Sequence, residues 1–281
     1  MLRRLAYVAA AALAVVGVTA APASAGSINP HTTSSYYLAL GDSLAYGYQP
    51  THVTGQGYVD DLYANLHATD ANLQLNNLGC PGETSATMIS GGVCSYPEGN
   101  QLDAAIHFIR SHPLRVKLIT IDIGANDVDH CLSTGTIDQT CINDGLAAIA
   151  KNVTKIVVRL RLAAPFVKIV GMNYYDPFLA AYLQGPTGPA LALQSLTLAD
   201  KLNRELTAIY RLGGFKVADV AGAFSTDDFT TMVPIAPGVT VPLDVARICQ
   251  WTWMCTVPPG PDIHANPAGY AVMAQAFAAT L

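Results

Sequence analysis

The order of apolar and amphipathic segments constrains the fold of this chain more than any other feature. Short apolar runs, each typical of a buried strand, alternate with longer segments that carry a helical pattern. Such alternation predicts an α/β domain with a parallel sheet built from βαβ units. Strands are expected at residues 37–40, 73–78, 116–123, 167–172 and 215–220, and helices at residues 58–66, 102–111, 144–162, 191–212 and 267–279.

The first 25 residues have the pattern of an export signal. Arg3 and Arg4 precede an apolar run, and Ala23-Ser24-Ala25 fits the small-residue rule for signal-peptide cleavage. The run is too short to span a bilayer, and no later stretch approaches the roughly 20 continuous apolar residues that spanning requires. We therefore expect a signal peptide at residues 1–25 and a single domain at residues 26–281. The product should be secreted, without an integral membrane segment.

The charge balance excludes one broad class of partner. The chain has 15 basic and 20 acidic residues, and removal of the signal peptide would take away Arg3 and Arg4, leaving a formal charge of −7. A nucleic-acid-binding face needs clustered Lys and Arg, which this composition does not supply. We expect a monomer that binds no nucleic acid and acts on a neutral or apolar small molecule or lipid.

Six cysteines form an even set, and disulfides are their expected use in an exported protein. They fall as three local pairs in loop-like sequence. Zinc binding is the alternative, but the Cys-x2-Cys spacing typical of zinc sites is missing. We therefore expect no metal site. The expected disulfides are Cys80–Cys94, Cys131–Cys141 and Cys249–Cys255.

Two long stretches, residues 174–189 and 224–261, fit neither pattern and are expected to be irregular. Loops of this length in a compact domain are usually functional or disordered. The second stretch carries both tryptophans and a cysteine pair, which favours an ordered wall. The aromatic residues of the two stretches could line an acyl or aryl pocket or be ordinary loop packing. These residues are Tyr174, Tyr175, Phe178, Tyr182, Trp251 and Trp253.

A candidate nucleophile follows the first predicted strand. The stretch from Tyr37 to Gly47 reads YLALGDSLAYG, so a buried strand runs directly into Gly-Asp-Ser-Leu. Open α/β sheets bind ligands beyond the carboxyl ends of their strands, and this position therefore suits a catalytic serine, Ser43. Taken alone, Ser43 could also be a helix cap, and Asp42 is expected to have a turn or cap role.

Acyl transfer also needs a base and donors for the developing oxyanion. After the second predicted strand, the turn Gly79-Cys80-Pro81-Gly82 can bring the bare backbone of Gly82 close to a ligand. After the third, Asn126 can donate through its side-chain amide. His264 stands just before the final predicted helix. Each of these residues alone could be a turn former, but their order along the chain is specific.

With these four blocks in order, the chain resembles the GDSL or SGNH hydrolases over nearly the whole mature sequence. The resemblance implies a doubly wound, flavodoxin-like sheet, ester hydrolysis without a cofactor, and Ser43 as nucleophile with His264 as general base. It also implies an oxyanion hole made by the backbone N–H groups of Ser43 and Gly82 and the side chain of Asn126. The cysteine pairs further resemble a secreted actinobacterial esterase and lipase-like branch.

One position departs from the pattern of the family. An Asp commonly stands three residues before the histidine, but this chain has Pro261 there, and the nearby carboxylate is Asp262. Two hypotheses follow. Asp262 orients His264 in a shifted triad, or a backbone carbonyl does so and the enzyme uses a Ser43–His264 dyad.

The sequence predicts a secreted carboxylic ester hydrolase that acts on acyl or lipid esters, and two alternative functions stay open. The chain could be a polysaccharide O-deacetylase or a non-catalytic secreted binding protein on the same scaffold. The α/β-hydrolase elbow requires G-x-S-x-G and is disfavoured because Ala45 replaces its last glycine. Asp127 and Asp129 are interpreted as solvated loop acids.

Overall fold

The computed structural model describes residues 34–133 and 136–281. The signal peptide predicted for residues 1–25 lies outside the described residues. Within those ranges, every helix is too short or too polar to cross a bilayer.

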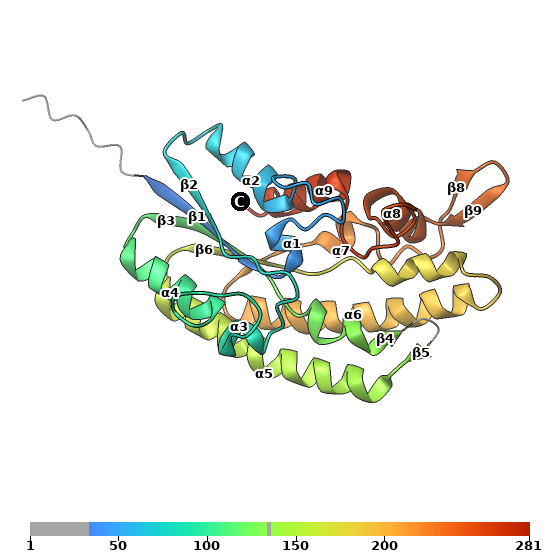
Figure 1. Cartoon of the computed structure of the whole chain (residues 1–281), viewed down its shortest axis with the longest axis horizontal. Coiled ribbons are helices and arrows are strands. Elements are labelled where there is room, and N and C mark those ends of the chain that lie inside the picture. Colours follow the sequence, from blue (N-terminus) through green and yellow to red (C-terminus); the bar gives the residue numbers. More distant parts are fainter. Residues whose placement is uncertain (1–33, 134–135) are drawn as a thin grey trace, which may run out of the picture. The chain divides into compact units, whose positions relative to one another are not determined.

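A five-stranded parallel sheet forms the centre of the fold, with the order β2-β1-β3-β6-β7 (Figure 1). The chain moves to one side of β1 to form β2 and then returns to form β3 and the later strands on the other side. This doubly wound, flavodoxin-like order confirms the predicted fold class. The strands are β1 (Ser35–Gly41), β2 (Leu73–Asn77), β3 (Val116–Asp122), β6 (Lys168–Met172) and β7 (Lys216–Ala218).

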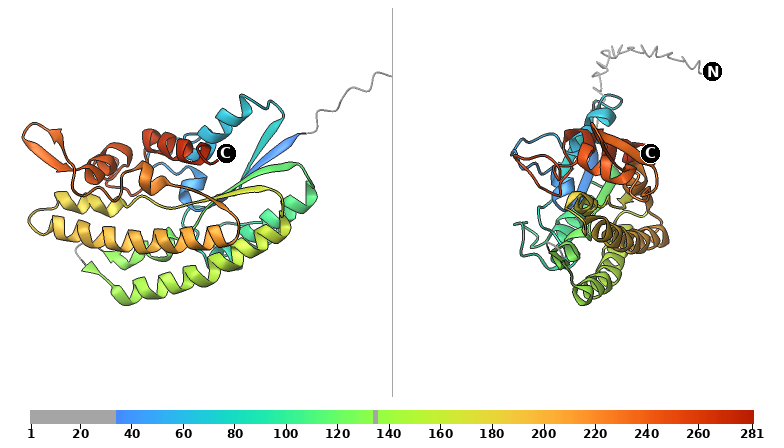
Figure 2. Two further views of the ribbon diagram at one scale, coloured as in Figure 1. Left: turned by 180° about the vertical axis from the view of Figure 1, so that it is seen from behind. Right: turned by 90° about the vertical axis from the view of Figure 1, so that its right-hand side faces the viewer.

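Helices cover both faces of the sheet (Figures 1 and 2). The helices α2 (Tyr58–His67) and α9 (Pro267–Ala278) pack together on one face, where the ring of Tyr58 stacks on that of Phe277. The other face is covered by three neighbouring helices. Of these, α4 packs against α5, and α5 packs against α6. Their bounds are α4 (Gln101–Ser111), α5 (Gln139–Ala163) and α6 (Gly188–Leu212).

The core explains why these segments form these elements. Every residue of β1 except Tyr36 is buried, because β1 lies inside the sheet with helices on both sides. On α5, the buried residues Ile149, Val153, Ile156 and Leu160 recur at helical spacing and face the sheet side. The polar tip of the fully buried Tyr37 is paired with Thr120 on β3 at 2.8 Å.

The two stretches expected to be irregular contain regular structure, and that expectation was wrong in part. Residues 224–261 include an antiparallel hairpin, β8 (Met232–Ala236) and β9 (Val239–Pro242), and the helix α8 (Leu243–Trp251). Residues 174–189 include the 3-10 helix η3 (Pro177–Leu183) and the first two residues of α6. Prolines obscured these elements in the sequence. They occupy positions where a backbone N–H is dispensable, such as an edge strand and the first turn of a helix.

The remaining elements are short and lie mostly in the connections that follow the strands. They are α1 (Ser43–Tyr46), α3 (Thr87–Ser90), η1 (Ala125–Asp127), η2 (Asp129–Cys131), β4 (Leu132–Ser133), β5 (Thr136–Ile137) and α7 (Val220–Ala223). Three disulfides tie these connections: Cys80–Cys94, Cys131–Cys141 and Cys249–Cys255. They join the same pairs that the sequence predicts.

Candidate active site

Ser43 lies at the carboxyl end of β1, where the strand ends in a turn that only glycine can make. Gly41 has a φ of 145°, and a Cβ at this position would come within 2.5 Å of the carboxylate of Asp122. Asp42 then caps α1 by accepting a hydrogen bond from the backbone of Leu44 at 2.9 Å, as expected for a cap. Ser43 is the first residue of this helix and is 9% exposed.

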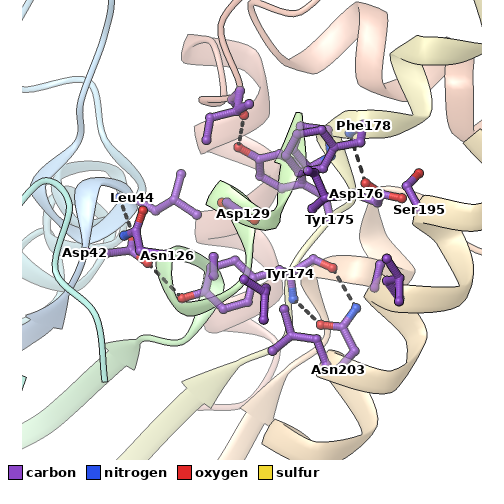
Figure 3. Close-up of a pocket in the computed structure, with 18 of the residues that line it drawn as sticks. Asp42, Leu44, Asn126, Asp129, Tyr174, Tyr175, Asp176, Phe178, Ser195 and Asn203 are labelled. Atoms are coloured by element: carbon purple, nitrogen blue, oxygen red, sulfur yellow. Dashed lines mark hydrogen bonds between the residues drawn. The ribbon is translucent and has the colours of Figure 1, made fainter. Parts of the chain in front are cut away.

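A network of buried polar groups fixes this turn on the side that faces the core. The backbone N–H of Asp42 donates to Asp122 on β3 at 3.1 Å, and the hydroxyl of Tyr174 donates to the carboxylate of Asp42 at 3.0 Å (Figure 3). Gln101 brackets Gly41 by accepting from its N–H and donating to its carbonyl. Burial, followed by the neighbouring carboxylate of Asp122, raises the pKa of Asp42 well above its usual range. The turn is therefore part of the core.

His264 contacts both Ser43 and Asp262. Its Nε2 lies 2.8 Å from Ser43 Oγ, and its Nδ1 lies 2.6 Å from Asp262 Oδ1. The same carboxylate oxygen accepts the backbone N–H of His264 at 2.9 Å. Burial acts to raise the pKa of Asp262, but the hydrogen bonds from His264 outweigh it and leave the pKa below its usual range.

This arrangement bears directly on the two hypotheses for orienting the histidine. Asp262 accepts the backbone N–H two residues ahead in an Asx turn, and the turn brings its carboxylate to the imidazole. A carboxylate at Nδ1 keeps the proton on that nitrogen, so that Nε2 can accept the Ser43 hydroxyl proton. The geometry is that of a shifted Ser43–His264–Asp262 triad. The carboxylate of Asp262 takes the place of the Asp that the family commonly has at the position of Pro261.

The loop that carries His264 is anchored to other loops. The backbone N–H of Trp253 donates to the carbonyl of His264 at 3.0 Å, and the hydroxyl of Tyr175 donates to the carbonyl of Ile263 at 2.9 Å. The ring of Tyr48 lies 4.4 Å from the His264 imidazole, centroid to centroid. Tyr48 belongs to none of the four sequence blocks. Its closeness to the GDSL block, five residues after Ser43, is the one signal that could have indicated it.

The residues expected to form an oxyanion hole follow three different strand ends. Asn126 lies in η1 after β3, and its side-chain amide donates one hydrogen to the carbonyl of Glu83 at 2.9 Å, while its other amide hydrogen has no acceptor among the described residues. Gly82 has a φ of 82° and is exposed. Neither the Ser43 nor the Gly82 backbone N–H donates to another described residue. Of these three residues, Ser43 and Asn126 line one pocket.

A pocket of about 770 Å³, counting the part that is open to solvent, begins at Ser43 and His264 and extends between η2, η3, α5 and α6. Much of its wall is aliphatic and comes from α5 and α6. Of the six aromatic residues singled out, Tyr174, Tyr175 and Phe178 line the pocket (Figure 3). The other three pack elsewhere: Tyr182 against Phe229, Trp251 against Phe224, and Trp253 with its indole N–H on Gln49.

The sequence led us to expect that Asp127 and Asp129 are solvated loop acids, but at least one of them is buried. Asp127 is buried, and its two carboxylate oxygens accept the N–H and hydroxyl of Ser85 at 2.8 Å and 2.6 Å. Asp129 is partly buried and lines the pocket. The interpretation was wrong for Asp127 because Ser85, from a loop far away in sequence, supplies two donors that hold its carboxylate inside the protein.

One group of side chains among the described residues has ligand atoms close enough together for a metal ion, namely His130, Cys131 and Cys141. The two cysteines are joined in a disulfide, so their sulfur atoms are not available as thiolate ligands. No residue of this group lines the pocket at Ser43.

Comparison with protein families agrees with this geometry. The profile of the GDSL-like Lipase/Acylhydrolase family matches residues 39–272, a span that runs from the middle of β1 into α9 and includes Ser43, Gly82, Asn126 and His264. No curated protein sequence matches the chain.

Solved structures with the same fold include several ester hydrolases. An extracellular lipase from Streptomyces rimosus is 18% identical with a TM-score of 0.59, over 88% of this chain and 100% of that one. Phospholipase A1 from Streptomyces albidoflavus is 16% identical with a TM-score of 0.55, over 88% and 100%. Axe2, an acetylxylan esterase from Geobacillus stearothermophilus, is 18% identical with a TM-score of 0.55, over 88% and 94%. At these identities the likeness shows a shared fold.

Proposed function

Because the chain belongs to the GDSL-like lipase and acylhydrolase family and is therefore an ester hydrolase, we propose that it cleaves carboxylic esters through an acyl-Ser43 intermediate. The observation that carries this proposal is the continuous hydrogen-bonded line from Ser43 Oγ through His264 to Asp262, at 2.8 Å and 2.6 Å. Nucleophile, base and orienting group are thus within hydrogen-bond reach of one another, as serine catalysis requires.

The first half of the reaction forms the acyl enzyme. His264 Nε2 takes the proton of Ser43 as Oγ attacks the ester carbonyl carbon, and the carbonyl oxygen becomes an oxyanion. The N–H groups of Ser43 and Gly82 and the amide of Asn126 donate to this oxygen, and each such donor can contribute about 3 kcal/mol. Collapse of the intermediate breaks the bond to the leaving oxygen, which takes the proton from Nε2.

The second half returns the enzyme to its starting state. A water molecule gives a proton to His264 Nε2 and attacks the acyl carbon, and the resulting intermediate expels Ser43 Oγ, which recovers its proton from Nε2. Asp262 keeps its charge throughout and stabilises the imidazolium that forms twice in each cycle. This chemistry requires no cofactor.

The pocket favours acyl or lipid esters over acetylated polysaccharides as substrates. Its walls are largely aliphatic, and such surface gains about 0.8 kcal/mol for each methylene group that it removes from water. A sugar-binding groove is expected to present a continuous row of aromatic faces, whereas here Tyr174, Tyr175 and Phe178 stand beside a larger number of aliphatic residues, and Trp251 and Trp253 do not line the pocket. The three disulfides support export of the protein, since such bonds persist in oxidising compartments.

Hydrolysis of p-nitrophenyl esters from acetate to palmitate tests the proposal. Wild type should be active with a preference for an intermediate or longer chain, and Ser43→Ala should lower kcat by about 10⁴-fold or more. Ser111→Ala, an exposed serine on α4, is the matched control and should behave as wild type. A serine-directed phosphonate should label wild type and not Ser43→Ala. Unchanged turnover in Ser43→Ala would remove Ser43 from the scheme, and activity on acetylated glycans alone would favour the deacetylase alternative.

A further inference from the structure

The pocket beside Ser43 contains two carboxyl groups that the proposed reaction does not use. Asp129 enters from η2, and Asp176 enters from the segment between β6 and η3 (Figure 3). Both line the same pocket as the aliphatic side chains of α5 and α6. An acidic group in the wall of an apolar pocket costs free energy unless something pairs with it.

Asp176 has one satisfied and one unsatisfied oxygen. Its Oδ1 caps η3 by accepting the backbone N–H of Phe178 at 2.9 Å, which accounts for the conformation of the side chain. Its Oδ2 is buried and has no hydrogen-bond partner among the described residues, although Asp176 as a whole is only 3% exposed. The neighbouring hydroxyl of Ser195 donates to the carbonyl of Ala192 at 2.9 Å. The helix cap therefore accounts for one oxygen of this carboxylate, and the second oxygen is an acceptor without a partner in a residue that lines the pocket.

No positive charge compensates these acids. Among the described residues that line the pocket, none is a lysine or an arginine. Burial, and then the nearby carboxylates of Asp42 and Asp176, raise the pKa of Asp129 to about 8. Burial raises the pKa of Asp176 to about 6, although the Ser195 hydroxyl offsets part of this. At neutral pH, Asp129 is therefore mainly protonated and Asp176 mainly ionised, so the pair carries one negative charge, on Asp176, with no cationic side chain in the pocket wall.

We propose that Asp176, with Asp129 nearby, forms a polar subsite that binds a hydrogen-bond donor, an ammonium or hydroxyl group, on the acyl part of the ester. This inference rests on the proposed function and assigns to the pocket a substrate class that a purely aliphatic wall would not select. An aliphatic segment of the acyl chain contacts α5 and α6, and a donor further along it pairs with Asp176 Oδ2. A hydrogen bond to a charged, desolvated group is worth enough to raise kcat/KM about tenfold or more.

Matched p-nitrophenyl esters test the subsite. The esters of hexanoic and octanoic acid are compared with counterparts that end in a hydroxyl or an ammonium group, so that the leaving group stays constant. We expect wild type to favour at least one donor-bearing ester over the plain ester by about tenfold in kcat/KM, mainly through KM. A preference for ammonium alone would identify charge as the feature recognised, and an equal preference for hydroxyl would identify the hydrogen bond.

Asp176→Asn turns the unpaired acceptor into a donor while keeping an oxygen for the Phe178 N–H. The ratio between donor-bearing and plain esters should fall close to one in this variant. Asp129→Asn is the second variant, should Asp176→Asn not fold, and should lower the same ratio by a smaller factor. Asp144→Asn, at an exposed position on α5, removes the same charge outside the pocket and should keep the wild-type ratio.

The outcomes separate this inference from the function on which it rests. Hydrolysis of the plain esters with a ratio of one in wild type would overturn the subsite and leave the esterase in place. A preference that persists in both Asp176→Asn and Asp129→Asn would also overturn the subsite. Failure to hydrolyse any of the esters would overturn both the proposed function and the subsite.

Discussion

The turn that carries Ser43 and the loop that carries His264 meet in one site but are held by different parts of the molecule. The Ser43 turn continues a buried central strand, and its support comes from β3, α4 and the hydroxyl of Tyr174. The His264 loop is part of the surface, and its support comes from Trp253, Tyr175 and the stretch closed by Cys249–Cys255. Ser43 is positioned by the core and His264 by contacts between loops.

This difference has a consequence for mutation. A change in the Ser43 turn disturbs buried groups that also stabilise the sheet, so activity and stability should fall together. A change in the His264 loop removes contacts that few other residues share, so activity should fall while the domain stays folded. Variants of the two regions, compared for activity and stability, test this separation.

Gly41→Ala should have the largest effect on the whole molecule. The added Cβ would meet both the side chain and the backbone of Asp122 at 2.5 Å, and we expect a loss of about 4 kcal/mol in the free energy of unfolding together with loss of activity. Gly92→Ala is the matched control, since Gly92 also has a positive φ, 109°, but has no atom within 4 Å of the added Cβ. Urea unfolding of both variants measures the difference. Equal losses would show that backbone strain, and not the core contact, requires glycine at position 41.

Asp262→Asn should lower activity strongly and stability little. An amide cannot hold the Nδ1 proton as a carboxylate does, and such a change lowers kcat by up to about 10⁴-fold in serine hydrolases. We expect at least about a hundredfold loss in kcat for p-nitrophenyl butyrate, with a Tm within about 3 °C of wild type. Asp144→Asn serves as the control. Near wild-type turnover in Asp262→Asn would favour the Ser43–His264 dyad and remove the orienting role of Asp262.

Asn126→Ala should reduce kcat by about a hundredfold and leave KM nearly unchanged, since its amide donates to an oxyanion that exists only in the transition state. Loss of the bond from Asn126 to Glu83 should cost about 1 kcal/mol of stability. Steady-state kinetics over a range of ester concentrations separates kcat from KM. An increase in KM alone would show that Asn126 binds the ground state and is not part of the oxyanion hole.

The smallest expected effect concerns pH and the acids in the pocket. The pKa of Asp129 is about 8 in the folded protein and about 3.9 when unfolded, so between these values the folded state binds more protons. Stability should therefore fall as the pH rises from 5 to 8, and Asp129→Asn should remove part of this fall, about 2–4 °C in Tm. Thermal unfolding of both proteins across this pH range measures the difference. An identical pH dependence would show that Asp129 is not desolvated.

Much of the fold could be predicted because its signals are local. The runs that form β1, β3 and β6 are short, apolar and bounded by turn residues, and α5 and α6 carry a strong helical pattern. The prediction failed in the stretch at residues 224–261, where α8 and the β8–β9 hairpin form. Their sequence is rich in proline. In spite of this weak local preference, α8 is stabilised by packing against η3 and α9, and the hairpin packs against α8.

The sequence by itself determined the order of the strands and turns, the positions of Ser43, Gly82, Asn126 and His264 after or before particular elements, and the local cysteine pairs. These follow from residue type and spacing along the chain. Only the tertiary structure decided that Asp262 reaches His264, that Tyr174, Tyr175 and Phe178 line the pocket while Trp251 and Trp253 do not, and that Asp176 and Asp129 enter its wall. The reason is physical: side-chain direction and burial depend on contacts between segments far apart in sequence, which residue spacing does not encode.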